Sequence, residues 1–200
     1  SLNVGRTAVV TTGATGFSVT GASFALSTVS LGTESFTGVS AALTDAALIG
    51  VAAVDLRVSG TVKLNSTSRV DGQRIDWTTA TNATNDPSDL IAALAITKAQ
   101  QLSATGNASL NIGPGNVVAV ITGFALEMAT ADVVTGNAAL GTAGTLTGAN
   151  VLSFTITSAD LFVGTGGSLN VGRTAVVTTG ATGFSVTGAS FALSTVSLGT

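Results

Sequence analysis

The fold is decided by a stretch of eleven residues, VDLRVSGTVKL, at positions 54–64. Every second residue from Val54 to Leu64 is apolar or glycine, and the residues between them are polar or charged. This period of two is typical of a β-strand, because successive side chains point to opposite faces of a sheet. We therefore predict a strand with one buried apolar face and one face exposed to water.

Two further segments predict strands in the same way. QLSATGNASLNI, at 101–112, alternates throughout its length. In VVAVITGFALEM, at 117–128, the apolar residues that we place in phase are Val118, Val120, Phe124, Leu126 and Met128. The chain therefore carries several long strands with one apolar face each.

The alternation changes phase beside Thr-Gly pairs. Phe17 and Val19 are odd-numbered and Phe24 and Leu26 even-numbered, on either side of Thr20-Gly21, and odd numbering returns at 29 and 31. A change of phase at small residues is what a β-bulge or a corner between sheets produces. We predict such irregularities at these points.

Two local features depart from simple alternation. Asp71-Gly72 has the preferred sequence of a two-residue hairpin turn. NDPSDLIAAL, at 85–94, predicts one short helix, with Asp86 as N-cap, Pro87 in the first position and Asp89 in the third. The remainder predicts an all-β fold: an elongated tandem-repeat, solenoid-like stack of β-sheets with long strands, or alternatively a string of packed antiparallel β-sandwich repeats.

The chain repeats itself. Residues 1–33 return unchanged at 168–200, an offset of 167 residues. A fold tolerates exchanges such as Val for Ile, so complete identity favours a tandem array of near-identical units over structural constraint, with a terminal duplication as the alternative. We expect residues 1–167 to be one full repeat and 168–200 the start of the next, within a longer protein. No polar linker separates them, so the units should stack on one another.

A shorter internal similarity is also present. DLRVSGTVKLN (55–65), QLSATGNASLN (101–111) and DLFVGTGGSLN (160–170) align without gaps, with Leu in the second position and Leu-Asn at the end. They predict three diverged sub-repeats of about 56 residues in each unit.

Composition excludes several classes of function. The sequence contains no Cys and no His, which removes thiolate chemistry, histidine-bound zinc and histidine-based triads. Only 8% of residues are charged and the net charge is −3, without the basic cluster that a nucleic-acid partner requires. No run of 18 apolar residues predicts a transmembrane segment.

Few side chains remain as candidates for chemistry. Asp86 and Asp89 are weak candidates for calcium ligands, although a helix cap explains them better. The pair Asp71 and Asp76 could serve glycosidic chemistry, but neighbouring arginines should keep both carboxylates ionised. Trp77 could stack on a sugar, and we favour packing in a core for it. The sequence therefore predicts no catalytic residue, no cofactor and no enzyme.

The pattern L-x-V-x-G-x-x-x-L-N, followed by the segments ATGNASLNIG and VITGFALEM, resembles giant bacterial exported tandem β-strand-repeat proteins, some with a LEPR-XLL domain or large adhesin-like repeat regions. The resemblance implies an extracellular or cell-surface scaffold. We expect a structural repeat of a long filament, stalk or sheath whose partners are neighbouring copies, end to end. The alternative is a repeat module of a large adhesin that binds a surface or glycan.

Overall fold

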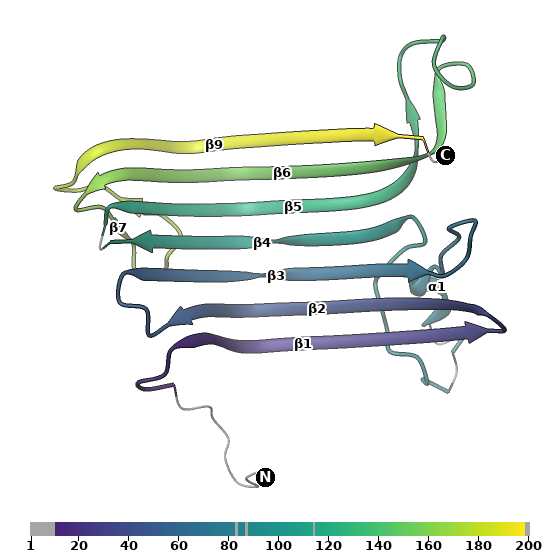
Figure 1. Ribbon diagram of the computed structural model, residues 1–200, viewed down its shortest axis with the longest axis horizontal. Coiled ribbons are helices and arrows are strands. Elements are labelled where there is room, and N and C mark those ends of the chain that lie inside the picture. The colour runs from purple at the N-terminus through teal and green to yellow at the C-terminus, as the bar shows by residue number, and fades with distance from the viewer. Residues whose placement is uncertain (1–10, 83, 87, 114, 199–200) are drawn as a thin grey trace, which may run out of the picture.

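The computed structural model describes residues 11–198 except 83, 87 and 114 (Figure 1). The long strands are β1 (Gly16–Leu31), β2 (Glu34–Ile49), β3 (Val54–Thr67), β4 (Gln100–Ile112), β5 (Val117–Val134), β6 (Thr145–Thr165) and β9 (Thr182–Ser197). The short elements are α1 (Trp77–Ala80), β7 (Ser168–Leu169) and β8 (Val176–Val177). The prediction of an all-β fold with long strands is confirmed.

Seven strands form a single open antiparallel sheet in the order β1-β2-β3-β4-β5-β6-β9. Strands that follow one another in the chain lie side by side in this sheet, so its topology is a meander (Figure 1). Two longer connections interrupt it: residues 68–99, which contain α1, and residues 166–181, which contain β7 and β8. Among the described residues, β1 and β9 form the two edges of the sheet.

The strands predicted at 54–64, 101–112 and 117–128 are present as β3, β4 and β5. β3 and β4 pair without a register shift from Val54, opposite Ile112, to Leu64, opposite Leu102. Gly60 lies opposite Gly106, and a Cβ on either residue would lie 2.1 Å from backbone oxygen of the other strand. Glycine at both positions therefore permits the close approach of the two backbones.

The tight hairpin turn is at Gly32-Thr33, between β1 and β2, where Gly32 has φ +61°. Positive φ at the first central residue is the requirement of a type II′ hairpin turn, which glycine meets without strain. The hairpin predicted at Asp71-Gly72 is wrong. The turn lies one residue earlier, with Val70 and Asp71 at its centre, because the Gly72 N–H donates to the Arg69 carbonyl at 3.1 Å. It opens the long 68–99 connection and does not join two paired strands.

The predicted helix at 85–94 is also wrong, because none of its described residues is helical. The Asp86 carboxylate instead accepts hydrogen bonds from the Leu90 and Ile91 amides in an irregular loop. Pro87 lies outside the described residues. The short helix α1 lies earlier, where Asp76 is the N-cap and its carboxylate accepts from the Thr79 amide.

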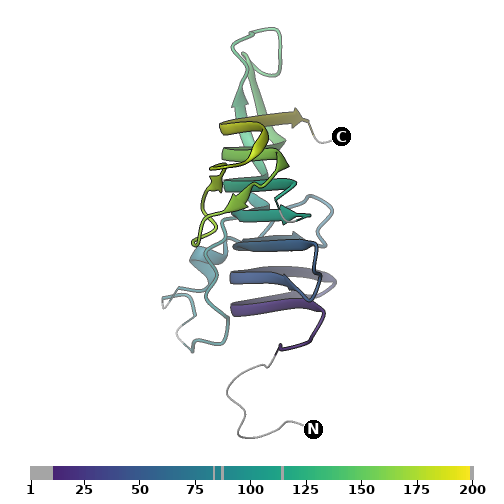
Figure 2. The same ribbon diagram turned by 90° about the vertical axis from the view of Figure 1, so that its left-hand side faces the viewer.

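The two faces of the sheet differ in what covers them. The predicted apolar face is covered by neither long connection: Val62 and Leu64 are exposed, and Leu56 and Leu102 are half-buried. The opposite face carries the polar residues of the alternation, and both long connections pack on it (Figure 2). Asn65 on this face is 2% exposed, whereas Leu64 beside it is 39% exposed. The prediction of a buried apolar face and a wet polar face therefore does not hold within this chain.

A small core forms where residues 68–99 cover β1–β3. Trp77, Leu94 and Ile96 are buried there, against Ala25 and Val29 of β1. The Trp77 Nε1–H donates to Asn65 Oδ1 at 2.9 Å, so its one polar atom is satisfied. Val29 lies on this face and not with Phe24, so the second phase change expected at residue 29 is absent.

A second cover is formed by residues 166–181. Val118, Val120 and Phe162 are buried beneath it, and the Arg173 guanidinium forms an ion pair with Asp55 of β3. The prediction that Val118 and Val120 share a face with Phe124 is wrong, because the two valines point to the covered face and Phe124 to the uncovered one. The bulge at Gly123 moves the residues after it to the other face.

Each of the three sequence segments proposed as sub-repeats contains a length of β-strand. The segments 55–65 and 101–111 are neighbouring strands that run in opposite directions, in β3 and β4. The segment 160–170 begins in β6 and continues through a turn into β7. The structural unit that recurs here is the single strand. Within the residues that the structure describes, no helix is long and apolar enough to cross a membrane.

Candidate interaction site: the edges and faces of the sheet

The two edges of the sheet have the same sequence. β9 repeats β1 with an offset of 167 residues, so that Gly183 corresponds to Gly16 and Gly188 to Gly21. β1 pairs with β2 on one side, and β9 pairs with β6 on one side. Each strand therefore leaves one row of backbone groups unpaired in the part of the chain that the structure describes. Such an edge is a template for another strand.

A recurring bulge gives these strands a specific geometry. At Gly123 of β5, φ is +69° and the register against β4 shifts between Gly106 and Ala108. The Gly123 N–H donates to Asn107 Oδ1 of β4 at 2.9 Å. On the other side, Thr157 Oγ1 of β6 donates to the Gly123 carbonyl at 3.1 Å. The glycine is therefore held by an acceptor on the preceding strand and a donor on the following strand.

The acceptor half of this motif occurs twice more. The Gly148 N–H donates to Asp132 Oδ1, and the Gly188 N–H donates to Asp160 Oδ1, each at 2.8 Å. Both glycines have φ between 65° and 68° and both lie at register shifts. An Asn or Asp side chain on the preceding strand thus receives the glycine amide that the bulge removes from the ladder.

The donor half occurs at Gly21. Thr44 Oγ1 of β2 donates to the Gly21 carbonyl at 3.0 Å, as Thr157 does to Gly123. The φ of Gly21 is +66°, although pairing with β2 continues in register from Thr20 to Ala22. Among the described residues no side chain accepts from the Gly21 N–H. Gly21 and Gly188 are the same residue of the repeated sequence, and each carries one half of the motif.

The uncovered face of the sheet is apolar. Phe17 and Phe24 on β1 are 71% and 69% exposed. Residues that lie directly opposite each other on paired strands share a face, and the registers place further exposed apolar side chains there: Val19, Leu26, Leu43, Val62, Leu64, Met128, Val163, Phe184, Phe191 and Leu193. A contiguous apolar surface of this kind marks a contact with other protein.

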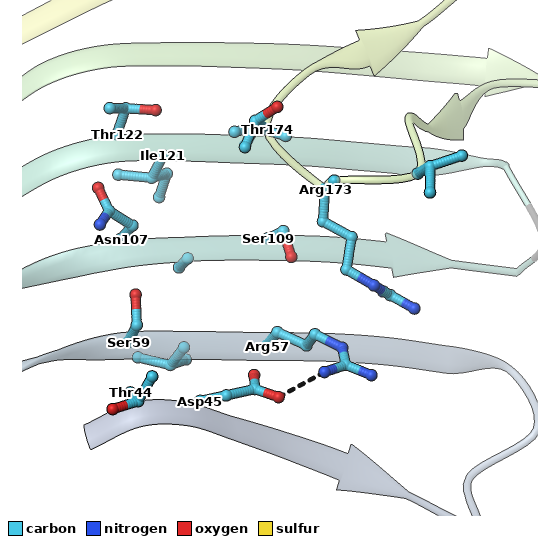
Figure 3. A pocket seen from close by; sticks show the side chains of 15 residues that line it. Thr44, Asp45, Arg57, Ser59, Asn107, Ser109, Ile121, Thr122, Arg173 and Thr174 are labelled. Atoms are coloured by element: carbon cyan, nitrogen blue, oxygen red, sulfur yellow. Dashed lines mark hydrogen bonds and ion pairs between the residues drawn. The ribbon is translucent and has the colours of Figure 1, made fainter. Parts of the chain in front are cut away.

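The polar face holds an open hollow of about 820 Å³ beside the 166–181 cover, which contributes residues 171–174 to its lining (Figure 3). Polar side chains such as Ser59 and Asn107 line it together with apolar ones such as Val120 and Ile121. Arg57 forms an ion pair with Asp45 at 2.5 Å, and Arg173 is paired with Asp55. Because both guanidinium groups are paired with carboxylates, the hollow presents hydrogen-bonding groups more than net charge.

The residues singled out by sequence are dispersed and serve the structure. Trp77 is fully buried, as the packing interpretation predicted. The hydrogen bond from the Arg69 guanidinium holds the pKa of Asp71 at about 2, below its ordinary value of 3.8. Hydrogen bonds from Thr78 and nearby amides lower the pKa of Asp76 at the N-terminus of α1. Asp71 and Asp76 are thus occupied with separate partners.

The acidic loop gives no sign of a metal site in the described residues. Asp86 caps the turn to Leu90 and Ile91, and Asp89 adopts φ +50°. No group of three His, Cys, Asp or Glu side chains that could hold a metal ion occurs in the described part of the chain.

The glycine bulge with its Asn or Asp acceptor was missed by sequence reasoning. Its sequence signal is an Asn or Asp 16 residues before the glycine of a Thr-Gly pair, as in Asn107 with Gly123 and Asp132 with Gly148. Comparison of the chain with protein-family models, curated proteins and solved structures gives no match.

Proposed function

We propose that this chain is a structural repeat of a long extracellular filament, stalk or sheath of a bacterial cell surface, without catalytic activity. One observation carries the proposal: the same sequence forms both edges of the sheet, at β1 and at β9. A molecule whose two ends are the same strand can be extended by whole units without a change of geometry.

The chemistry of the side chains supports a mechanical role. The sequence has no Cys or His to act as a nucleophile or a general base near neutral pH. The carboxylates of Asp71 and Asp76 are engaged by Arg69 and by the N-terminus of α1. Backbone ladders between strands of 13 to 21 residues provide most of the visible cohesion of the sheet.

The extracellular location is part of the proposal and draws on two features. The absence of Cys suits a large exported polypeptide, because no unwanted disulfide can form in an oxidising compartment. The resemblance to exported bacterial β-strand-repeat proteins points to the same compartment.

Immunogold labelling of the source cells tests this function. An antibody raised against the folded chain should decorate filaments or a continuous layer outside the cell. The label should follow the filament. We expect successive repeats in the filament to lie about 29 Å apart, because each repeat contributes six strands spaced by about 4.8 Å. Label confined to the cell interior would contradict the proposal.

A second candidate is an adhesin module that binds a glycan or surface, and the hollow on the polar face favours it. Its hydroxyl and amide lining matches the donors and acceptors of a sugar. Trp77 is buried, however, and offers no stacking surface. Binding to immobilised glycans tests this candidate. If the chain binds and both Asn107→Ala and Ser59→Ala abolish the binding, the adhesin is favoured over the purely structural repeat.

A further inference from the structure

We propose that successive repeats join by sharing one strand, so that the strand that is β9 of one repeat is also β1 of the next. This inference rests on the proposed array and specifies its junction. On one side the shared strand pairs with β6 of the earlier repeat through Asp160. On its other side it pairs with β2 of the later repeat through Thr44. The sheet then continues across the junction without an edge.

The conformation of Gly21 is the first support. In β1 this glycine adopts φ +66°, although its pairing with β2 shows no register shift. The same residue in β9, Gly188, has φ +68° and lies at a bulge against β6. β1 therefore has the bulged geometry that a preceding strand requires, at an edge where the described chain supplies no such strand.

The second support is that the two half motifs make one whole. Gly188 has the acceptor, Asp160, and Gly21 has the donor, Thr44. Placed on a single glycine, Asp160 on one side and Thr44 on the other reproduce the arrangement of Asn107 and Thr157 around Gly123. The complete motif inside the sheet is thus the template for the junction.

Strand direction is compatible with this junction. Each neighbour in the order from β1 to β9 is antiparallel, and six steps separate the two edges, so β1 and β9 run in the same direction (Figure 1). A shared strand keeps every pair antiparallel. Direct pairing of β9 with β1 of a second, translated copy would be parallel and would leave Gly21 without an acceptor.

The apolar face is also preserved across the junction. Following directly opposed residues across the sheet leads from Phe24 through Ala41, Val62, Ala104, Leu126 and Phe154 to Leu193. Leu193 corresponds to Leu26 of the first copy, two residues beyond Phe24. Because side chains alternate with a period of two, a shift of two residues returns the apolar side chains to the same face.

Amide hydrogen exchange tests the junction with a built-in control. We would compare the 200-residue chain with a two-repeat chain, residues 1–167 followed directly by residues 1–200. The copies of the strand have identical sequences and therefore nearly identical intrinsic exchange rates. In the 200-residue chain, β1 should be protected at the amides that face β2, and β9 at those that face β6, including Gly188.

In the two-repeat chain, the middle copy of the strand should be protected at both sets of amides. We expect exchange at its formerly outward amides to slow by at least about a hundredfold relative to an edge copy, as for a strand inside a sheet. A middle copy that remains unprotected on one side would overturn the shared strand. If immunogold nevertheless showed surface filaments, the proposed structural function would still hold. The repeats would then be separate sheets that are joined in another way.

Variants of Asp160 in the first repeat sharpen the test. Asp160→Ala should accelerate exchange at the glycine amide of the middle strand by about tenfold, through loss of one hydrogen bond. Asp160→Asn should restore slow exchange, because Asn107 fills this role at Gly123. Thr44→Val in the second repeat should accelerate exchange at the same strand. Failure of both Asp160→Ala and Thr44→Val to affect the middle strand would contradict the proposal.

Discussion

Gly38 of β2 lies directly beneath the indole of Trp77, and replacing it with alanine should destabilise the protein. A Cβ at this position would lie 2.6 Å from Leu94 Cδ1 and 2.7 Å from Trp77 Cε2, where the core leaves no room. Its φ is outside the left-handed region, so alanine by itself would favour the strand by about 0.5–1 kcal/mol. Overpacking of a core costs about 1–3 kcal/mol. We expect a net loss of about 1–2 kcal/mol in the free energy of unfolding.

Urea titration followed by tryptophan fluorescence measures this loss. Trp77 is the one tryptophan of the chain and is fully buried, so its emission reports on this core. Gly172→Ala is the control, since its Cβ would lie 3.6 Å from Thr174 Oγ1, an ordinary contact. If Gly38→Ala proves as stable as Gly172→Ala, the steric argument is wrong.

A double-mutant cycle isolates the steric contribution. Trp77→Phe removes the indole atoms that the new methyl group would strike, and also the donor to Asn65 Oδ1, at a cost of about 1–3 kcal/mol. Gly38→Ala should therefore cost less in the Trp77→Phe background than alone, by about 1 kcal/mol. Circular dichroism gives the midpoints for all four proteins. Costs that add without coupling would refute the contact between Gly38 and Trp77.

Three further outcomes are expected. The hydrogen bond from Arg69 lowers the pKa of Asp71 to about 2, so their pair stabilises the fold above pH 4 and this contribution is lost as the pH falls from about 4 to 2; urea midpoints across that range should fall less steeply in Asp71→Asn. Asp55→Asn should speed tryptic cleavage after Arg173, by freeing the 166–181 cover from β3, whereas Asp45→Asn should leave the cleavage rate unchanged. Addition of a calcium chelator should shift the melting temperature by less than about 4 °C, as monitored by circular dichroism.

Alternation predicted the strands well because it follows from the geometry of the backbone. VDLRVSGTVKL and QLSATGNASLNI are β3 and β4, and the phase change around Gly21 corresponds to a residue with positive φ. Alternation identifies which residues share a face, but it contains no information on which face another segment will cover. That is why Asn65 is buried and Leu64 exposed, against expectation.

The connections were harder to predict because tertiary contacts decide them. At 85–94 the Asp86 carboxylate binds the Leu90 and Ile91 amides, and this local alternative replaces the helix that its capping sequence favours. The helix α1 begins at Trp77, after the N-cap Asp76. It is only four residues long, too short for a helical period to be recognised in the sequence. The hydrogen bond between the Gly188 amide and Asp160, which we assign to the junction, could not be predicted from the sequence. The two residues are 28 positions apart and meet only through strand pairing.

The position of the two edge strands also determines how the molecule would respond to tension. In the proposed array, a pull on the chain ends acts across the strands, along the inter-strand hydrogen bonds. Such a load opens the ladder from one end a few bonds at a time, whereas a load along the strands would strain all of them together. Each released strand of 16 residues adds about 54 Å of extended chain, at about 3.4 Å per residue. The proposed filament would therefore unfold at low force, lengthen strand by strand, and refold when the tension falls.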